Sequence, residues 1–186
     1  TVSHSPTEAT RVPRPDATVA SRVPTLVQDL ILGTAARQPG RPALRSGPTL
    51  LAYDELARLV AATARGLLGL GLGPRDRVAV YLPKTVETVA TFFGTALAGG
   101  VFVPVNPVLK ANQVGHILRD SGARVLVTSS SRLAALAEIL PTAPDLQWVV
   151  LTDAAVTTPG PGPRHVRWSE LTGETGDRRA GHRAID

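Results

Sequence analysis

Residues 96–107 read Ala-Leu-Ala-Gly-Gly-Val-Phe-Val-Pro-Val-Asn-Pro, and we call them the decisive stretch because they carry the clearest structural signal in the chain. The pair Gly99-Gly100 allows a helix to end and the backbone to turn sharply into a short apolar strand. Pro104 has no N–H to offer a sheet ladder, which is typical of a position near a strand end. We therefore predict a helix that ends before the glycines and a buried strand over residues 101–105.

The same stretch lies inside an uncharged run, residues 88–109, that is long enough to span a bilayer. The glycine pair divides this run, and Pro104 and Pro107 interrupt its second half. A helix, a turn and a strand account for all of these residues. We therefore expect no membrane span.

Helical and extended segments alternate on both sides of this stretch. Apolar residues at helical spacing predict helices, and short apolar runs closed by Gly or Pro predict strands. The predicted helices cover residues 26–37, 54–68, 85–97, 111–121 and 131–140. The predicted strands cover residues 43–45 and 49–51, which form a hairpin, and 77–82, 101–105, 124–128 and 148–151. This alternation, with apolar strands, indicates an α/β fold in which helices cover a mostly parallel sheet.

The chain of 186 residues has the length of one domain. Residues 1–24 contain four prolines and are interpreted as a mobile leader. They hold no apolar run of signal-peptide length, so we expect a cytoplasmic protein. The α/β unit is assigned to residues 25–153. Residues 154–186 are expected to form a Pro- and Gly-rich linker and a loose tail, with a short strand at 165–167 and a short helix at 169–171.

Composition excludes several classes of protein. The absence of cysteine excludes disulfide scaffolds, cysteine nucleophiles, zinc fingers and iron–sulfur clusters. The 4 histidines lie too far apart in the sequence to indicate a metal site. The net charge is +5, but the arginines are scattered and the chain has only 2 Trp, 2 Tyr and 3 Phe. A nucleic-acid surface needs a continuous basic stripe, so we expect no nucleic-acid partner.

Two stretches are compared with phosphate-binding loops. Gly69, Gly71 and Gly73 follow a helix rather than a strand, so their amides are not poised at a helix N-terminus. We interpret them as a helix stop. The three serines at 129–131 follow a strand and open a helix, where an anion can bind. Because no glycines flank them, we expect them to cap the helix instead.

Isolated charged residues give weaker signals. Lys84 follows the strand at 77–82 and could reach a ligand at the carboxyl end of the sheet, but a solvated surface lysine is the simpler expectation. His116 lies among apolar residues and is expected to be a partly buried packing residue rather than a base. Two carboxylate pairs show no arrangement that acid–base chemistry requires: Asp54 with Glu55, and Asp76 near Glu87.

Two stretches read together resemble a known family. Leu50-Leu51-Ala52-Tyr53-Asp54-Glu55-Leu56 resembles the first core motif of the AMP-forming adenylating enzymes, which include acyl-CoA synthetases, luciferases and peptide-synthetase adenylation domains. Residues 96–107 resemble the second core motif. Residues 76–80 and 116–127 match in the same order, so the resemblance covers residues 25–153. It implies the N-terminal part of the large domain of such an enzyme.

Within this family, Asn106-Pro107 followed by Leu109-Lys110 is more similar to acyl- or aryl-CoA ligases than to peptide-synthetase domains, which tend to carry aspartate there. The run from residue 82 through residue 118 is most similar to the acyl-CoA ligases associated with exosortase systems. The resemblance implies a small-molecule carboxylate substrate and an enzyme that uses ATP, Mg²⁺ and CoA. In such enzymes an acyl-adenylate forms first, and CoA then displaces AMP.

The resemblance carries over no catalytic residue and no metal ligand. The family's phosphate loop, its aromatic–Thr–Glu motif, its ribose-binding aspartate and its C-terminal lysine find no match in this chain. We expect the phosphate loop to begin a few residues past Asp186. The chain alone is therefore expected to be inactive and to bind none of these ligands tightly. Lys110 is the one candidate cofactor-binding residue, because the loop after the second motif borders the CoA channel in some relatives. Val108 stands where some of those relatives carry a basic residue.

Three hypotheses for the function remain open. The favoured one is the N-terminal portion of an AMP-forming acyl-CoA ligase. The second is a non-catalytic α/β binding module, or one half of a split enzyme that acts with a partner. The third, a Rossmann-like nucleotide binder, is disfavoured because no phosphate loop follows a strand. A parallel sheet that lacks its neighbouring strands also predicts self-association through an exposed sheet edge.

Overall fold

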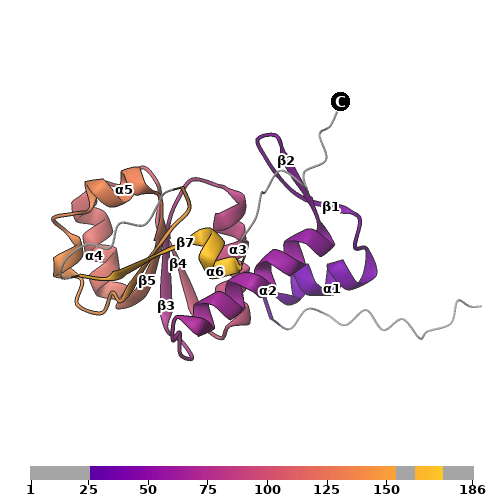
Figure 1. Ribbon diagram of the computed structural model, residues 1–186, viewed down its shortest axis with the longest axis horizontal. Helices are drawn as coiled ribbons and strands as arrows, with labels where there is room; N and C mark the ends of the chain where they lie inside the picture. The colour runs from indigo at the N-terminus through magenta and orange to yellow at the C-terminus, as the bar shows by residue number, and fades with distance from the viewer. Residues whose placement is uncertain (1–25, 154–161, 174–186) are drawn as a thin grey trace, which may run out of the picture.

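The computed structural model describes residues 26–153 and 162–173, and these form a parallel sheet with helices on both faces (Figure 1). The helices are α1 (Asp29–Arg37), α2 (Tyr53–Gly69), α3 (Val86–Leu97), α4 (Ala111–Ser121), α5 (Ser130–Ala135), the 3₁₀ turn η1 (Leu140–Thr142) and α6 (Trp168–Thr172). The strands are β1 (Pro42–Ser46), β2 (Thr49–Ala52), β3 (Arg77–Tyr81), β4 (Val101–Pro104), β5 (Ala123–Thr128), β6 (Trp148–Leu151) and β7 (Arg164–Arg167). The predicted α/β class is confirmed.

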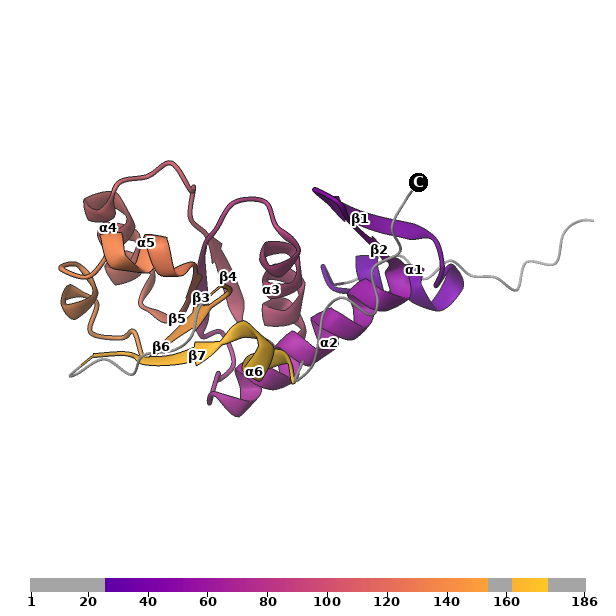
Figure 2. The same ribbon diagram turned by 45° about the horizontal axis from the view of Figure 1, so that its top comes forward.

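The main sheet has five parallel strands in the order β4-β3-β5-β6-β7. Strand β3 pairs with β4 on one side and with β5 on the other, so the chain reverses its direction across the sheet after β4. Because such crossovers share one hand, α3 and α4 must lie on opposite faces. Figures 1 and 2 show this arrangement, with α4 and α5 on one side of the sheet and α2, α3 and α6 on the other.

The side chains of β3 point alternately to the two faces of the sheet and contribute to the hydrophobic core on each face. Val78, Val80 and the following Leu82 pack under α2, α3 and α6, in a cluster that includes Trp168. Ala79 and Tyr81 point to the opposite face and join the cluster formed with α4 and the segment after α5. Every second residue therefore serves the same face, as the pleat of a strand requires. Burial on both faces explains why these strands are almost entirely apolar.

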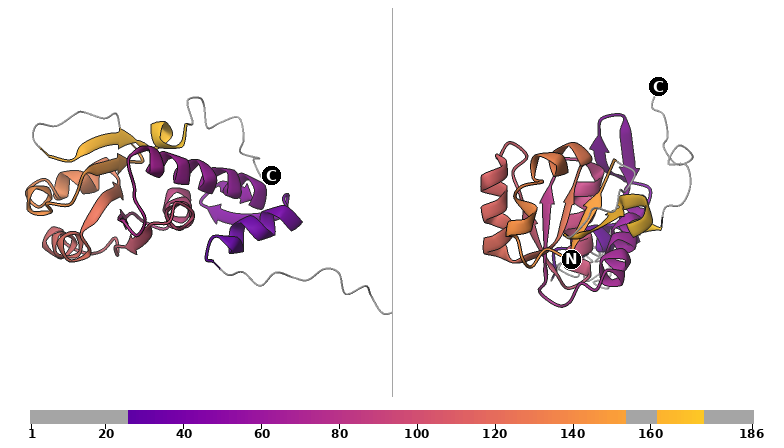
Figure 3. Two further views of the ribbon diagram at one scale, coloured as in Figure 1. Left: turned by 90° about the horizontal axis from the view of Figure 1, so that it is seen from below. Right: turned by 60° about the vertical axis from the view of Figure 1, so that its left-hand side comes forward.

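A third, smaller cluster lies beside the sheet. The antiparallel hairpin β1–β2 and helix α1 pack on the N-terminal half of α2 around Ile31, Leu51, Leu56 and Val60. Helix α2 begins at the end of β2, where the Glu55 carboxylate accepts a hydrogen bond of 2.8 Å from the Ala52 amide. Its C-terminal half packs on the sheet through Leu67. Figure 3 shows this long helix running from the hairpin to the sheet.

The helix and the glycine turn of the decisive stretch form as predicted, but the predicted burial of the strand is wrong: β4 ends the described sheet on one side, so Val101 and Pro104 are exposed. Helix α3 ends at Leu97, and Gly99 adopts a φ of 78°, which glycine reaches without the strain of a side chain. Gly100 is needed for another reason: a Cβ there would lie 3.0 Å from the Asp76 carbonyl oxygen. Strand β4 follows at once and forms an edge of the sheet, where the missing N–H of Pro104 is tolerated. Within the described ranges, no helix has both the length and the apolar character that crossing a membrane would need.

One helix is shorter than the sequence predicts. The helix predicted to reach residue 140 ends at Ala135, because the chain turns there to bring Ile139 against Gly115, and Leu140 and Pro141 then lie in the 3₁₀ turn η1. The short strand predicted at residues 165–167 and the short helix predicted at 169–171 are confirmed as β7 and α6, and they join the sheet and its core rather than a loose tail. Strand β7 pairs with β6, and α6 buries Trp168 and Leu171 against α2 and the sheet. The expected leader and most of the expected tail lie outside the described residues.

Candidate functional site

The loops that follow β3, β4 and β5 meet at one edge of the sheet. In open α/β sheets ligands bind at the carboxyl ends of the strands, near the point where the strand order reverses. Here that point lies between β3 and β5, which are neighbours in the sheet although α3, β4 and α4 separate them in the chain. Tyr81 and Thr128 end these two strands, and the Thr128 hydroxyl donates a hydrogen bond of 3.0 Å to the Tyr81 carbonyl oxygen.

Two side chains from other elements hold the loop that follows β4. The Tyr81 hydroxyl donates a hydrogen bond of 2.8 Å to the carbonyl oxygen of Leu109. The guanidinium of Arg132, on α5, donates one of 2.8 Å to the carbonyl oxygen of Pro107. The same guanidinium stacks on the Tyr81 ring at 4.6 Å from its centroid, a cation–π contact. We call residues 106–110 the β4 loop and this pair of side chains the Tyr81–Arg132 clamp.

The β4 loop carries the predicted ligand-binding residue. Lys110 is exposed and directly precedes α4, and its amide donates a hydrogen bond of 3.0 Å to the Gln113 side chain. Asn106 accepts a hydrogen bond of 3.1 Å from the Val108 amide, an Asx turn that bends the loop. Val108 is 80% exposed, so an apolar side chain stands free where some relatives were expected to carry a basic one.

The serines after β5 do not act as predicted. The side chain of Ser129 caps no amide of α5. Instead the Asp153 carboxylate, at the end of β6, accepts hydrogen bonds from the amide and the hydroxyl of Ser130 at 2.8 and 3.0 Å. The prediction of capping by the serines is therefore wrong, because a carboxylate from the neighbouring strand already neutralises this helix start. That carboxylate also opposes the binding of an anion there.

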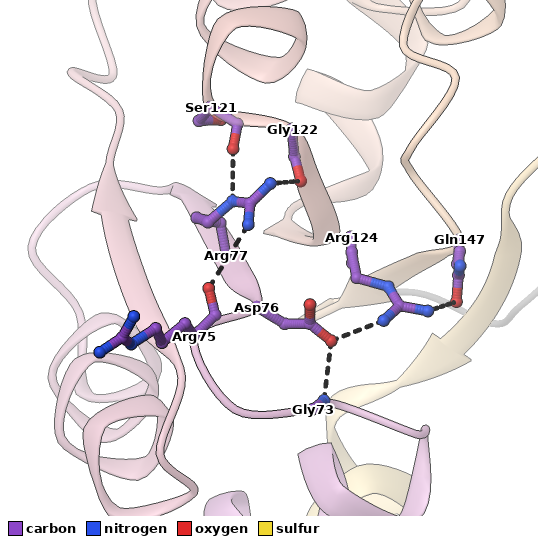
Figure 4. Close-up of polar contacts among 8 residues, drawn as sticks. All are labelled: Gly73, Arg75, Asp76, Arg77, Ser121, Gly122, Arg124 and Gln147. Atoms are coloured by element: carbon purple, nitrogen blue, oxygen red, sulfur yellow. Dashed lines mark hydrogen bonds and ion pairs between the residues drawn. The ribbon is translucent and has the colours of Figure 1, made fainter.

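A separate polar cluster lies at the opposite, amino ends of the strands (Figure 4). The Asp76 carboxylate accepts hydrogen bonds of 2.7 Å from the Gly73 amide and 2.7 Å from Arg124, which also donates to Gln147 at 3.0 Å. Arg77 donates to the carbonyl oxygens of Ser121 and Gly122 at the end of α4. The charged side chains of Asp76, Arg77 and Arg124 all have protein partners, so the cluster joins strands and turns rather than presenting a reactive side chain.

The other candidate residues are dispersed over the surface. Lys84 is exposed, as predicted. His116 is also exposed, so its predicted burial is wrong: Val114 and Leu118 face the core, and residues two apart on a helix point in different directions. Gly69 ends α2 and Gly71 adopts a φ of 87°, which confirms the helix stop. Asp54 pairs with Arg58 on the surface of α2.

The described residues do not fit a complete ATP site. Among residues 26–153 and 162–173, no three His, Cys, Asp or Glu side chains gather as a metal ion would require. No glycine-rich turn connects a strand to a helix in these ranges. The N-terminus of α5, beside the switch point, already donates its Ser130 amide to the Asp153 carboxylate. The sheet edge therefore offers a positioned loop and an exposed lysine, but no group that could hold a triphosphate with its magnesium.

Sequence reasoning singled out neither Tyr81 nor Arg132. A signal for Tyr81 was present: a tyrosine in an otherwise aliphatic strand buries a hydroxyl that needs a partner. Nothing local signals Arg132, whose partners lie at residues 81 and 107.

Comparison with known proteins agrees with this architecture. A feruloyl-CoA synthase from Amycolatopsis is 44% identical over 93 residues, which are 50% of this chain and 19% of that protein. A probable non-canonical nonribosomal peptide synthetase, CymA from Salinispora arenicola, is 33% identical over 118 residues, 63% of this chain and 2% of that protein. Two of the three kinds of protein that the resemblance names, acyl-CoA synthetases and peptide synthetases, are therefore among the relatives.

A solved structure shows the same fold. The anthranilate CoA ligase AuaEII, crystallised with anthranoyl-AMP, superposes with a TM-score of 0.73 at 22% identity, over 83% of this chain and 29% of that one. The chain thus spans less than a third of each of these proteins. The model of the protein family described as AMP-binding enzyme matches residues 33–174 of this chain, which include nearly all of the described fold. The chain therefore belongs to the AMP-binding enzyme family.

Proposed function

We propose that this chain supplies the N-terminal α/β portion of an AMP-forming acyl-CoA ligase that acts in the cytoplasm. Such an enzyme joins a carboxylate to ATP, giving acyl-AMP and pyrophosphate, and the thiol of CoA then displaces AMP to give acyl-CoA. The observation that carries the proposal is the β4 loop. The sequence of its Asn106-Pro107 pair favours a CoA ligase, and the loop stands clamped at the ligand-binding edge of the sheet.

The chain's own contribution in this proposal is a scaffold. The two cores fix β3, β4 and β5 relative to one another, and their carboxyl ends set the positions of the loops. The residues that bind the triphosphate belong to other parts of the whole protein. Mg²⁺ would offset the charge of the triphosphate there. No step of the chemistry is assigned to a side chain of the described residues.

Lys110 is the residue that we propose for ligand binding. CoA carries several phosphate groups, and an exposed ammonium group is a suitable point charge for a phosphate. Its place at the end of the β4 loop supports this role. Because Val108 adds no second charge, the proposed electrostatic contribution of this loop rests on Lys110 alone.

The test compares two proteins. The chain of 186 residues is assayed for exchange of labelled pyrophosphate into ATP with short, medium and long fatty acids and with aryl acids. We expect no exchange above a blank. The full translation product of the gene is assayed in the same way and then for acyl-CoA formation, where we expect acyl-CoA and AMP in equal amounts.

Two outcomes would overturn the proposal. Turnover by the chain of 186 residues, surviving repurification, would show that it holds a nucleotide site of its own. A full translation product that activates no carboxylate would favour the alternative, a non-catalytic α/β module or a split-enzyme half. A partner that restores activity when added would identify the split enzyme.

A further inference from the structure

Two side chains from distant parts of the sequence hold the backbone of the β4 loop. Two of its carbonyl oxygens, those of Pro107 and Leu109, accept hydrogen bonds from side chains that lie 25 and 28 residues away in the sequence. The loop's own side chains do not account for this. Leu109 packs partly against the core, but Val108 and Lys110 are exposed. The clamp therefore fixes the backbone of a segment in which the side chains of Asn106, Val108 and Lys110 are exposed.

Arg132 is suited to this task in a way that lysine is not. Its planar guanidinium lies over the Tyr81 ring and at the same time donates to the Pro107 carbonyl oxygen. Stacking fixes the plane of the group, and the remaining N–H groups then point in set directions. A lysine could donate to the same carbonyl oxygen, but its ammonium group has no plane, so it would not fix the orientation of the hydrogen bond.

The clamp also joins three elements at the switch point of the sheet. Tyr81 ends β3, and its carbonyl oxygen accepts a hydrogen bond from the hydroxyl of Thr128 at the end of β5. The guanidinium of Arg132, on α5, lies over the Tyr81 ring. None of the residues Ser130–Ala135 of α5 is buried. The side chain of Arg132 therefore links this exposed helix both to a core strand and to the β4 loop.

We propose that Arg132, supported by Tyr81, is a positioning residue that holds the β4 loop and with it Lys110 in place for the phosphate groups of CoA. The proposal rests on the proposed ligase function for its ligand, but the clamp itself is tested without it. Arg132 touches no substrate; it acts through the backbone at Pro107. Loss of the clamp is expected to loosen the loop and leave the sheet intact.

The first experiment measures amide hydrogen exchange in the chain of 186 residues. The reporters are the amides of Val108 and Leu109, both bonded to Asn106, and the reference is the amide of Val105, bonded to Val80 in the sheet. In Arg132→Ala we expect exchange of the reporters to rise roughly tenfold while the reference stays unchanged. Arg132→Lys should fall between the two proteins. Tyr81→Phe, which keeps the ring and loses the hydroxyl, should raise exchange less than Arg132→Ala.

Arg58→Ala is the matched control, since it also removes an arginine but from the surface of α2. It should leave all three amides unchanged. Unchanged reporter exchange in Arg132→Ala, with the melting temperature retained, overturns the clamp. A rise at the Val105 reference equal to that at the reporters also overturns it, because Arg132 would then only stabilise the sheet.

The second experiment measures steady-state kinetics in the full translation product. Arg132→Ala should raise the KM for CoA by roughly five- to tenfold with kcat retained, and leave the KM for ATP unchanged. Arg132→Lys should recover part of the loss. Equal increases for both substrates, or no increase, would overturn the link to CoA. A wild-type protein that forms no acyl-CoA would instead refute the ligase function, and the exchange data would still decide the clamp.

Discussion

The carboxylate of Asp76 lies 2.7 Å from the guanidinium of Arg124, at the amino ends of two parallel strands that are neighbours in the sheet. The Asp76 side chain is only 16% exposed and also accepts the Gly73 amide. Its carbonyl oxygen receives the amide of Val101, the first residue of β4. One residue therefore connects the turn after α2 with three adjacent strands.

Removal of this carboxylate is expected to destabilise the fold. Asp76→Ala leaves the Gly73 amide and the Arg124 guanidinium without their shared partner, and should lower the free energy of unfolding by about 2 kcal/mol. Asp54→Ala is the control, because it breaks an exposed ion pair with Arg58 and should cost at most about 0.5 kcal/mol. Urea denaturation followed by tryptophan fluorescence measures both. Equal losses in the two variants would contradict the role of Asp76.

The contact between α2 and α6 depends on a missing side chain. A Cβ at Gly66 would collide with the carbonyl oxygen of Leu171, whereas one at Gly69 would meet open space. We expect Gly66→Ala to lower the free energy of unfolding by about 2 kcal/mol and to shift the emission of the buried Trp168 to longer wavelength. Gly69→Ala should leave both quantities nearly unchanged. A Gly66→Ala protein with wild-type emission and stability would show that α6 does not dock there.

Substitutions of Gly99 and Gly100 are expected to destabilise the protein to different extents. Gly99→Ala meets no atom but must adopt a φ of 78°, which should cost about 1 kcal/mol. Gly100→Leu meets the Asp76 carbonyl, Leu72 and Thr95 at once, so it should lower the soluble yield severely. We expect turnover per folded molecule of the full enzyme to change little. A folded Gly100→Leu protein without turnover would assign Gly100 to the chemistry rather than to the scaffold.

Self-association through a sheet edge stays a prediction, and the structure suggests which edge to test. Strand β7 exposes Arg164 and Arg167, and edge charges oppose pairing. Strand β4 instead exposes Val101 at 46%. If the chain of 186 residues associates, Val101→Lys should shift it toward the monomer in sedimentation velocity runs, and Arg164→Ala should not. Association that Val101→Lys leaves intact would exclude the β4 edge.

The sequence predicts the elements of this fold well because their signals are local. Mostly apolar runs of four to six residues become strands β3 to β6, and the glycine pair ends α3 where expected. The failure at α5 is also physical. Its apolar spacing continues to Leu140, but the chain turns after Ala135 so that Ile139 lies against Gly115, a contact between two segments that the spacing within one segment does not reveal.

The site was predicted less completely because its contacts span the chain. Lys110 could be named from a motif, while the side chains that hold its loop come from β3 and α5. The pairing of Asp76 with Arg124 joins residues 48 positions apart and leaves no local pattern. Spacing along one helix or strand gives no information about which loops a sheet brings together at its edge.

The close approach of Gly66 and Leu171 also has a consequence for synthesis on the ribosome. Helix α2 emerges early, and its N-terminal half can pack at once against α1 and the hairpin that precede it. The surface around Gly66 must wait for α6, the last described element to be translated. Chains fold from the N-terminus as they emerge, so the nascent protein carries an uncovered apolar strip on α2 throughout the translation of β3 to β7. A ribosome stalled before codon 168 should hold a chain in which this strip is open to chaperones, and one stalled well after codon 173 should not.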